Sequence, residues 1–180
     1  MAEIGCYSGE STVIFARNCR QVIAVDPWSD TYRKRITCGC SNADVLGHLA
    51  EHPPPHMSEI RRLFEERLRS YSNVKILAME SAEASRLVAD GSLDFVYIDA
   101  IHTFRHVCRD IDLWLPKVRP GGLIGGHDYS PGDWPGVVKA VNSRLGAPDE
   151  VLADTSWVKR LRNVKRAGSR AVRPKVKSRA

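Results

Sequence analysis

The chain has 180 residues, of which 43% are apolar and 27% are charged, a balance that suits a single globular domain and excludes a disordered chain. No apolar run reaches the roughly 18 residues that span a bilayer, and the N-terminus has neither the basic nor the apolar region of a secretory signal. We therefore expect a cytoplasmic protein without a membrane segment. Its five cysteines, an odd number, fit a reducing compartment.

The formal net charge of +6 is unevenly distributed along the chain. Residues 158–180 hold ten Lys or Arg and no acid, which leaves 17 basic and 21 acidic residues in 1–157. The tail is too poor in apolar side chains to offset the entropy of ordering, so we expect a domain at 1–162 and a disordered basic tail at 163–180. Nucleic-acid binding by these charges is an alternative, although no aromatic residue lies among them and no recognition motif is present.

Short runs of β-branched residues alternate along the chain with stretches in which apolar residues recur every three or four positions. This alternation predicts an α/β domain built on an open twisted sheet, mostly parallel, with helices on both faces. The strands are expected at 2–4, 22–25, 74–78, 93–98 and 123–126, with an antiparallel edge pair at 151–153 and 157–161. The helices are expected at 10–18, 58–70, 82–90, 104–115 and 136–145. Because the first strand begins at residue 2, the domain is expected to be N-terminally short.

The first predicted turn, EIGCYSGEST at 3–12, joins a strand to a helix and places Gly5 and Gly9 where the backbone turns sharply. Glu10 follows Gly9 where a triphosphate-binding loop needs Lys, and the middle glycine of a dinucleotide fingerprint is missing. Glu3 precedes the first glycine, and Asp26 ends the next strand, where a carboxylate can accept both hydroxyl protons of a ribose. The pattern favours a ribose-containing ligand over a nucleoside triphosphate.

This turn resembles the first motif of class I S-adenosylmethionine-dependent O-methyltransferases, the group that includes the catechol and caffeoyl-CoA enzymes. LDFVYIDAIH at 93–102 and PGGLIGGHDY at 120–129 resemble the fourth-strand and fifth-strand motifs, most closely those of the macrocin- and mycinamicin-type sugar enzymes. The resemblance covers about residues 2–160. It implies a Rossmann-like methyltransferase fold, S-adenosylmethionine as methyl donor, and a small-molecule hydroxyl, such as that of a sugar, as acceptor.

The resemblance also implies roles for individual residues. Asp26 would hold the ribose of the cofactor, and Ser81 would lie beside the adenine, with Glu80 as a further contact. The other residues implied to bind the cofactor are Glu3, Gly5, Tyr7, Gly9, Ser11 and Asp99. For Tyr7 and Ser11, an ordinary role at the start of a helix is the alternative.

The carboxyl ends of the fourth and fifth strands carry Asp99, His127 and Asp128, which adjacent parallel strands bring to one edge of the sheet. In the families that this sequence resembles, a divalent ion at these positions, Mg²⁺ for carboxylate ligands, activates the acceptor hydroxyl. His127 departs from that pattern, because those families have an acid there and an imidazole suits Mn²⁺, Fe²⁺ or Zn²⁺ better. A softer metal, no ligand role for His127 and no metal at all are the alternatives.

His102 lies three residues after Asp99, where the sugar enzymes carry a histidine, and we predict that it is the general base. A solvated histidine in front of a helix is the alternative. Residues 28–57 interrupt the alternation with CGC, histidines and prolines, which predicts an insertion that covers the site as a lid. A structural zinc in this insertion is a weaker alternative, because C-x-C is tighter than the usual spacing. Its ligands would come from Cys38, Cys40, His48, His52 and His56.

Three other functions stay open at the level of sequence. One is a nucleic-acid methyltransferase that uses the basic tail, although the loop expected for amino-group methylation is absent. Another is oxidative tailoring, as in cephalosporin-hydroxylase-like relatives, and the third is a truncated, non-catalytic partner subunit. A homodimer is compatible with the sequence, since small-molecule relatives often dimerise, and the acceptor is not identified.

Overall fold

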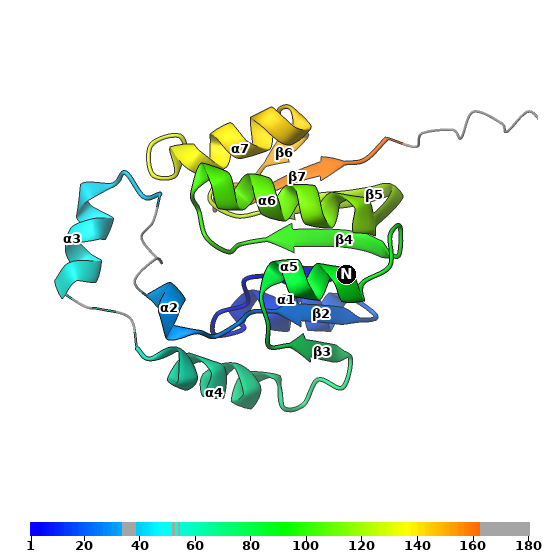
Figure 1. Ribbon diagram of the computed structural model, residues 1–180, viewed down its shortest axis with the longest axis horizontal. Coiled ribbons are helices and arrows are strands. Elements are labelled where there is room, and N and C mark those ends of the chain that lie inside the picture. The colour runs from blue at the N-terminus through cyan, green and yellow to red at the C-terminus, as the bar shows by residue number, and fades with distance from the viewer. Residues whose placement is uncertain (34–38, 52, 54, 163–180) are drawn as a thin grey trace, which may run out of the picture.

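A computed structural model gives the fold and describes residues 1–33, 39–51, 53 and 55–162. Its centre is a seven-stranded sheet in the order β3-β2-β1-β4-β5-β7-β6 (Figure 1). The first five strands are parallel, whereas β7 is antiparallel to both β5 and β6. The predicted α/β class, with its antiparallel edge pair, is confirmed. The strands are β1 (Ala2–Ile4), β2 (Val22–Val25), β3 (Val74–Leu77), β4 (Leu93–Ile98), β5 (Val118–Gly126), β6 (Glu150–Val151) and β7 (Trp157–Arg160).

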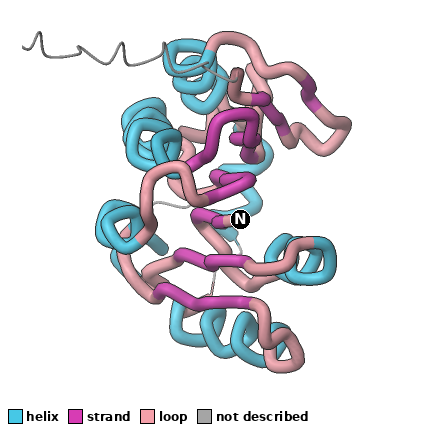
Figure 2. Tube along the Cα trace, turned by 90° about the vertical axis from the view of Figure 1, so that its right-hand side faces the viewer, coloured by secondary structure: helices cyan, strands magenta, loops and turns pink. Residues whose placement is uncertain are grey.

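The helices cover both faces of the sheet, as Figure 2 shows. On one face, α6 and α7 pack against each other and α5 contacts α6, while on the other face α1 and α4 are in contact. The amphipathic pattern of α6 explains its place, because Val107, Ile111 and Trp114 are buried at three- and four-residue spacing. The helices are α1 (Glu10–Asn18), α2 (Asp30–Arg33), α3 (Ala43–Glu51), α4 (Met57–Leu68), α5 (Ser81–Ala84), α6 (Phe104–Trp114) and α7 (Pro135–Leu145). Two short 3₁₀ turns, Ser85–Leu87 and Leu115–Lys117, follow α5 and α6.

Two predicted elements differ from the structure. The strand expected at 123–126 begins already at Val118. Its pairing with β4 is irregular between Leu93 and Phe95, and this irregularity accommodates Pro120, which cannot donate a backbone hydrogen bond. The helix expected at 82–90 is one short α-helix followed by a 3₁₀ turn. There the Ser85 hydroxyl donates to the Ala82 carbonyl, a local bond that competes with a regular helix.

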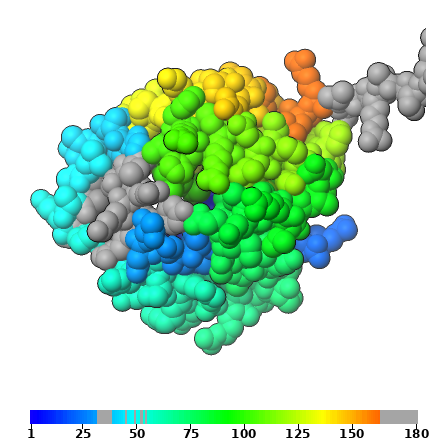
Figure 3. Space-filling view, in the orientation of Figure 1, coloured from blue at the N-terminus to red at the C-terminus, as the bar shows by residue number. Residues whose placement is uncertain are grey.

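The insertion between β2 and α4 contains α2 and α3. Two of its residues, Ser41 and Asn42, contact the loop after β5. The Ser41 N–H donates to the Asp133 carbonyl at 2.8 Å, and the Asn42 amide donates to the Asp133 carboxylate at 2.7 Å. Figure 3 shows this region, in cyan, beside the yellow segment that leads into α7. The insertion is thus docked onto the far half of the molecule.

Several expectations concern residues that the structure does not describe. The tail at 163–180 lies outside the described residues, as do Cys38 and His52 of the zinc alternative. Of the residues that are described, Cys40, His48 and His56 form no group of three metal ligands. No helix in the described ranges is long and apolar enough to cross a membrane.

Candidate active site

The loop between β1 and α1 is shaped by its glycines. Gly5 and Gly9 have φ values of 86° and 83°, in the left-handed region that favours glycine. A Cβ atom built on Gly5 would lie 2.0 Å from the carbonyl oxygen of Asp99, so only glycine lets this loop approach the end of β4. The loop therefore sits directly beside the carboxyl ends of β1 and β4.

Glu3, in β1, holds the helix that follows this loop. Its side chain is fully buried, and its carboxyl accepts hydrogen bonds from the hydroxyls of Ser11 and Thr12. Burial raises the pKa of Glu3 to about 7, against the lowering effect of the two hydroxyls. Glu3 anchors the start of α1, and it does not border the cavity described below.

Asp26, at the end of β2, is bound to the same loop. One carboxylate oxygen, Oδ2, accepts the backbone N–H groups of Cys6 and Tyr7 at 3.1 and 3.0 Å, and Oδ1 accepts that of Trp28 at 2.8 Å. Burial raises the pKa of Asp26, although these three bonds act in the opposite direction. A carboxylate has about four lone-pair positions, so Asp26 keeps capacity for one further hydroxyl donor, at Oδ1, rather than for two.

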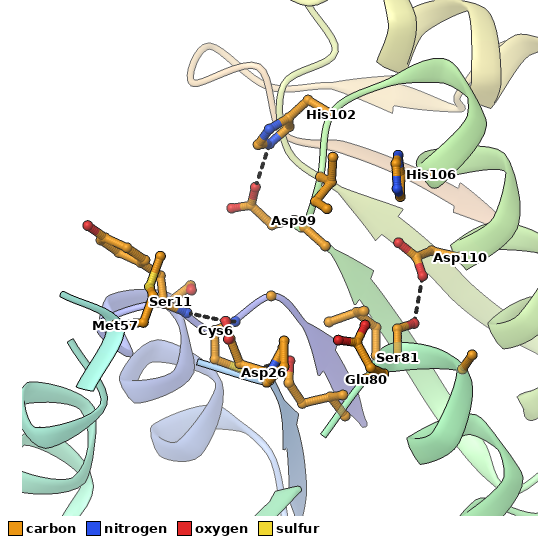
Figure 4. Close-up of a pocket in the computed structure, with 18 of the residues that line it drawn as sticks. Cys6, Ser11, Asp26, Met57, Glu80, Ser81, Asp99, His102, His106 and Asp110 are labelled. Atoms are coloured by element: carbon orange, nitrogen blue, oxygen red, sulfur yellow. Dashed lines mark hydrogen bonds and ion pairs between the residues drawn. The ribbon is translucent and has the colours of Figure 1, made fainter. Parts of the chain in front are cut away.

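A cavity of about 570 Å³ lies at the carboxyl end of the sheet, between β1 and β4 (Figure 4). The chain crosses to opposite faces of the sheet on either side of this point, which is where open α/β sheets bind ligands. Eight of the residues predicted from the sequence border the cavity, namely Gly5, Tyr7, Ser11, Asp26, Glu80, Ser81, Asp99 and His102. Four others, Glu3, Gly9, His127 and Asp128, do not border it.

Ser81 belongs to a hydrogen-bond relay that the sequence did not reveal. The Trp114 indole donates to the Ser81 hydroxyl at 2.9 Å, and this hydroxyl donates to Oδ1 of Asp110 at 2.6 Å. Asp110 is only 7% exposed, and burial raises its pKa to about 6 despite the bond from Ser81. Asp110 borders the cavity beside Glu80. A signal was present, because Asp110 is an acid on the otherwise apolar face of α6.

His102 lies between two carboxylates at the edge of the cavity. Its Nε2 is 2.7 Å from Oδ2 of Asp128 and 3.2 Å from Oδ1 of Asp99, and its ring packs on Trp134 with the centroids 4.4 Å apart. Burial lowers the pKa of His102, but the hydrogen bonds and charges of Asp128 and Asp99 outweigh it and raise the pKa to about 9. The imidazole is therefore positively charged at neutral pH in this arrangement.

The candidate metal group differs from the predicted one in its histidine. The donor atoms of Asp99, His102 and Asp128 all lie within 4.8 Å of one another, which makes these three the candidate metal group among the described residues. His127, the predicted third ligand, contacts Oδ1 of Asp128 through Nδ1 at 3.1 Å and is not one of the three. Two carboxylates and one neutral imidazole fit a divalent cation, so His102 would have to lose its proton before the three residues could bind one.

The order of the sheet and a cavity at its switch point define a Rossmann-like α/β domain, and the sequence comparison gives its family. Residues 2–129 match a family described as a methyltransferase domain, and the chain belongs to this family. None of the proteins with curated descriptions matches the sequence.

The solved structures show the same fold. The O-methyltransferase NovP aligns with a TM-score of 0.62 and 16% identity over 90% of this chain and 71% of its own. CalS11, a calicheamicin methyltransferase, aligns with a TM-score of 0.60 and 14% identity over 89% of this chain and 71% of its own. The chain spans only 21% of phosphoethanolamine N-methyltransferase 1 from Haemonchus contortus. At these identities, the likeness shows the fold alone.

Proposed function

We propose that this protein transfers a methyl group from S-adenosylmethionine to a hydroxyl of a small molecule. The observation that carries the proposal is that a residue suited to cofactor binding and residues suited to proton transfer border the same cavity. Asp26, a carboxylate suited to a ribose, borders it at the end of β2, and Asp99 with His102 borders it at the end of β4. A cavity of about 570 Å³ is large enough for a cofactor of this size.

The residues on the cavity fit the proposed cofactor. The left-handed turn at Gly5 brings the loop close to β4, and Asp26 keeps one acceptor position for a ribose hydroxyl. S-adenosylmethionine would supply a methyl group on a positively charged sulfur. The acceptor class is supported by the structural relatives, since CalS11 is described as a TDP-rhamnose 3′-O-methyltransferase and NovP as an O-methyltransferase.

In the proposed reaction, the acceptor oxygen forms a bond to the methyl carbon, the carbon–sulfur bond breaks, and the hydroxyl proton passes to Nε2 of His102. His102 can accept this proton only after losing its own, because Asp99 and Asp128 hold it as a cation. Metal assistance would be the alternative to this base: Asp99, Asp128 and His102 would hold a divalent ion, Nε2 of His102 would then be a ligand, and the ion would lower the hydroxyl pKa so that the proton passes to water. Alignment of oxygen, carbon and sulfur would provide much of the rate acceleration.

The proposal is tested by isothermal titration with S-adenosylhomocysteine. We expect micromolar binding by the parent protein and a loss of about tenfold or more in Asp26→Ala, since the loop loses two hydrogen bonds, Trp28 loses a third, and the ribose loses its acceptor. Asp90→Ala, which removes an exposed acid that pairs with Lys117 outside the cavity, is the control. Absence of binding by the parent protein would overturn the proposal.

The metal group is tested separately by thermal unfolding with Mn²⁺ and with Mg²⁺. A bound ion raises the melting temperature, and we expect this rise in the parent protein and in His127→Ala but not in Asp99→Asn or Asp128→Asn. A rise that disappears in His127→Ala and persists in His102→Ala would instead support the ligand set predicted from the sequence. If neither ion changes the melting temperature of the parent protein, the metal part of the proposal fails.

A further inference from the structure

Asp110 is a buried acid that the proposed reaction does not use. It lies on the cavity side of α6, next to Ser81 and away from the His102 cluster, as Figure 4 shows. Its side chain reaches the cavity from a helix whose neighbouring positions, Val107, Ile111 and Trp114, are all buried in the apolar core. Burying a carboxyl costs free energy unless its oxygens are bonded, so its position calls for a partner.

The direction of the relay that reaches Asp110 is fixed by chemistry. An indole N–H can only donate, so the Ser81 oxygen must accept from Trp114, and the Ser81 proton is then free to point at Oδ1 of Asp110. Trp114 is fully buried and cannot turn away. Oδ1 is therefore committed as an acceptor, and the orientation of the carboxyl group is fixed.

The second oxygen, Oδ2, is the part of Asp110 that remains for a ligand. Within the described residues, no hydrogen bond is recorded for it, and Figure 4 shows it turned toward the cavity. The charged neighbours that affect Asp110 are Arg109 and Glu80, which also border the cavity. An ionised carboxylate held in this way accepts a hydrogen bond and cannot donate one.

We propose that Asp110, oriented by Ser81 and Trp114, is a specificity residue that accepts a hydrogen bond from the exocyclic amino group of the cofactor's purine. The inference rests on the proposed function, since it concerns the same cofactor. With the ribose at Asp26 and the reacting methyl beside His102, the end of the cavity at Ser81 and Asp110 is left for the base. An amino group there is accepted, whereas the carbonyl oxygen of hypoxanthine meets an acceptor and is rejected.

The test compares two ligands that differ at this one group, S-adenosylhomocysteine and S-inosylhomocysteine, by isothermal titration. We expect the parent protein to bind the adenosyl ligand about tenfold or more tightly than the inosyl ligand. In Asp110→Asn, the relay holds the carbonyl oxygen of the new amide at Ser81 and turns its NH₂ group toward the cavity. The preference should therefore fall at least tenfold or reverse. A merely structural role would weaken both ligands equally.

Asp112→Asn is the matched control, because Asp112 lies on the same helix, is exposed and pairs with Arg144 at 2.9 Å outside the cavity. It should keep the parent preference. The double variant Asp110→Asn with Ser81→Ala should bind the two ligands about equally, with no preference for the inosyl ligand, since nothing then orients the amide. An unchanged preference in a folded Asp110→Asn overturns the inference. If that variant does not fold, equal binding of the two ligands by the parent protein overturns it. Failure of the parent protein to bind either ligand overturns the proposed function itself.

Discussion

At the scale of single residues, the cavity depends on acids that are stabilised in different ways. Asp128 has the opposite shift from Glu3: burial would raise its pKa, but the hydrogen bonds from His102 and His127 outweigh burial and lower it. Glu3 has only neutral partners, chiefly the hydroxyls of Ser11 and Thr12, so burial dominates and its pKa rises to about 7. A carboxyl group with a cationic partner is therefore charged at neutral pH, whereas one with hydroxyl partners is half protonated there.

The shift at Glu3 predicts a pH-dependent stability difference between the parent protein and Glu3→Gln. The Glu3 carboxyl has its ordinary pKa of 4.5 in the unfolded chain and a pKa of about 7 in the folded protein. The contribution of the protonated carboxyl to stability is therefore complete below pH 4.5 and is lost as the pH rises through 7. Glutamine keeps a neutral, hydrogen-bonding group at every pH. We expect the variant to match the parent near pH 4 and to exceed its free energy of unfolding by about 2–3 kcal/mol at pH 8.

Urea denaturation at several pH values measures this difference. Glu10→Gln, an exposed acid at the start of α1, is the control and should give a nearly constant difference across the range. A Glu3→Gln variant that is less stable than the parent protein at pH 8 would show that folding stabilises the ionised carboxylate, which contradicts a raised pKa at Glu3.

At the scale of elements, the loop after β5 connects the insertion to His102. It contains Asp128, which contacts His102, and ends with Trp134, on which the His102 ring packs. Between them, Asp133 accepts from Asn42 through Oδ1 and from Ser130 through Oδ2, both at 2.7 Å. The predicted lid is therefore bound to the loop that holds the imidazole.

This connection predicts that Asn42→Ala and Asp133→Asn each speed amide hydrogen exchange in residues 39–51 by about fivefold, because each removes a hydrogen bond between the insertion and the loop. The double exchange Asn42→Asp with Asp133→Asn reverses donor and acceptor and should restore slow exchange. Asp44→Asn, in α3 of the insertion, should leave the exchange rate unchanged. Rapid exchange in the double variant would mean that this pair does not hold the insertion in place.

Most elements could be predicted from the sequence because their patterns are local. β1, β2 and β4 begin and end at the predicted residues, since buried parallel strands are short β-branched runs between turn signals. β5 could not be predicted in full, because its first half contains Pro120 and glycines that favour turns, and only pairing with β4 makes it a strand. Tertiary pairing there overrides the local preference.

The candidate site was predictable where a residue follows directly from a strand end, as for Asp26 and Asp99. It was less predictable where side-chain direction depends on backbone geometry. Asp128 has a φ of 63°, in the left-handed region, and this turn directs its carboxylate toward His102, so the histidine that joins the two acids is His102 rather than its neighbour His127. Asp110 was missed because periodicity alone cannot show which acid on a helix meets a cavity.

At the scale of the whole molecule, the distribution of charge distinguishes a small-molecule enzyme from a nucleic-acid enzyme. Residues 163–180 carry seven Lys or Arg, so a chain ending at residue 162 changes from a net charge of +6 to −1. The last strand, β7, ends at Arg160, and every described residue that borders the cavity precedes it by a long stretch of sequence. A small-molecule enzyme does not need the basic tail for its cofactor site, whereas a nucleic-acid enzyme would need it for its substrate.

We therefore expect the chain ending at residue 162 to bind S-adenosylhomocysteine with the affinity of the parent protein, within about twofold, and to keep its melting temperature. Binding of a single-stranded oligonucleotide, measured by fluorescence anisotropy at several salt concentrations, should be weak in the parent protein, decrease steeply with salt and vanish on truncation. Such binding would come from counterion release alone and would not imply a nucleic-acid substrate. Oligonucleotide binding that survives both truncation and about 200 mM salt would point to a surface on the domain itself, and the methyl acceptor would then have to be sought among nucleic acids.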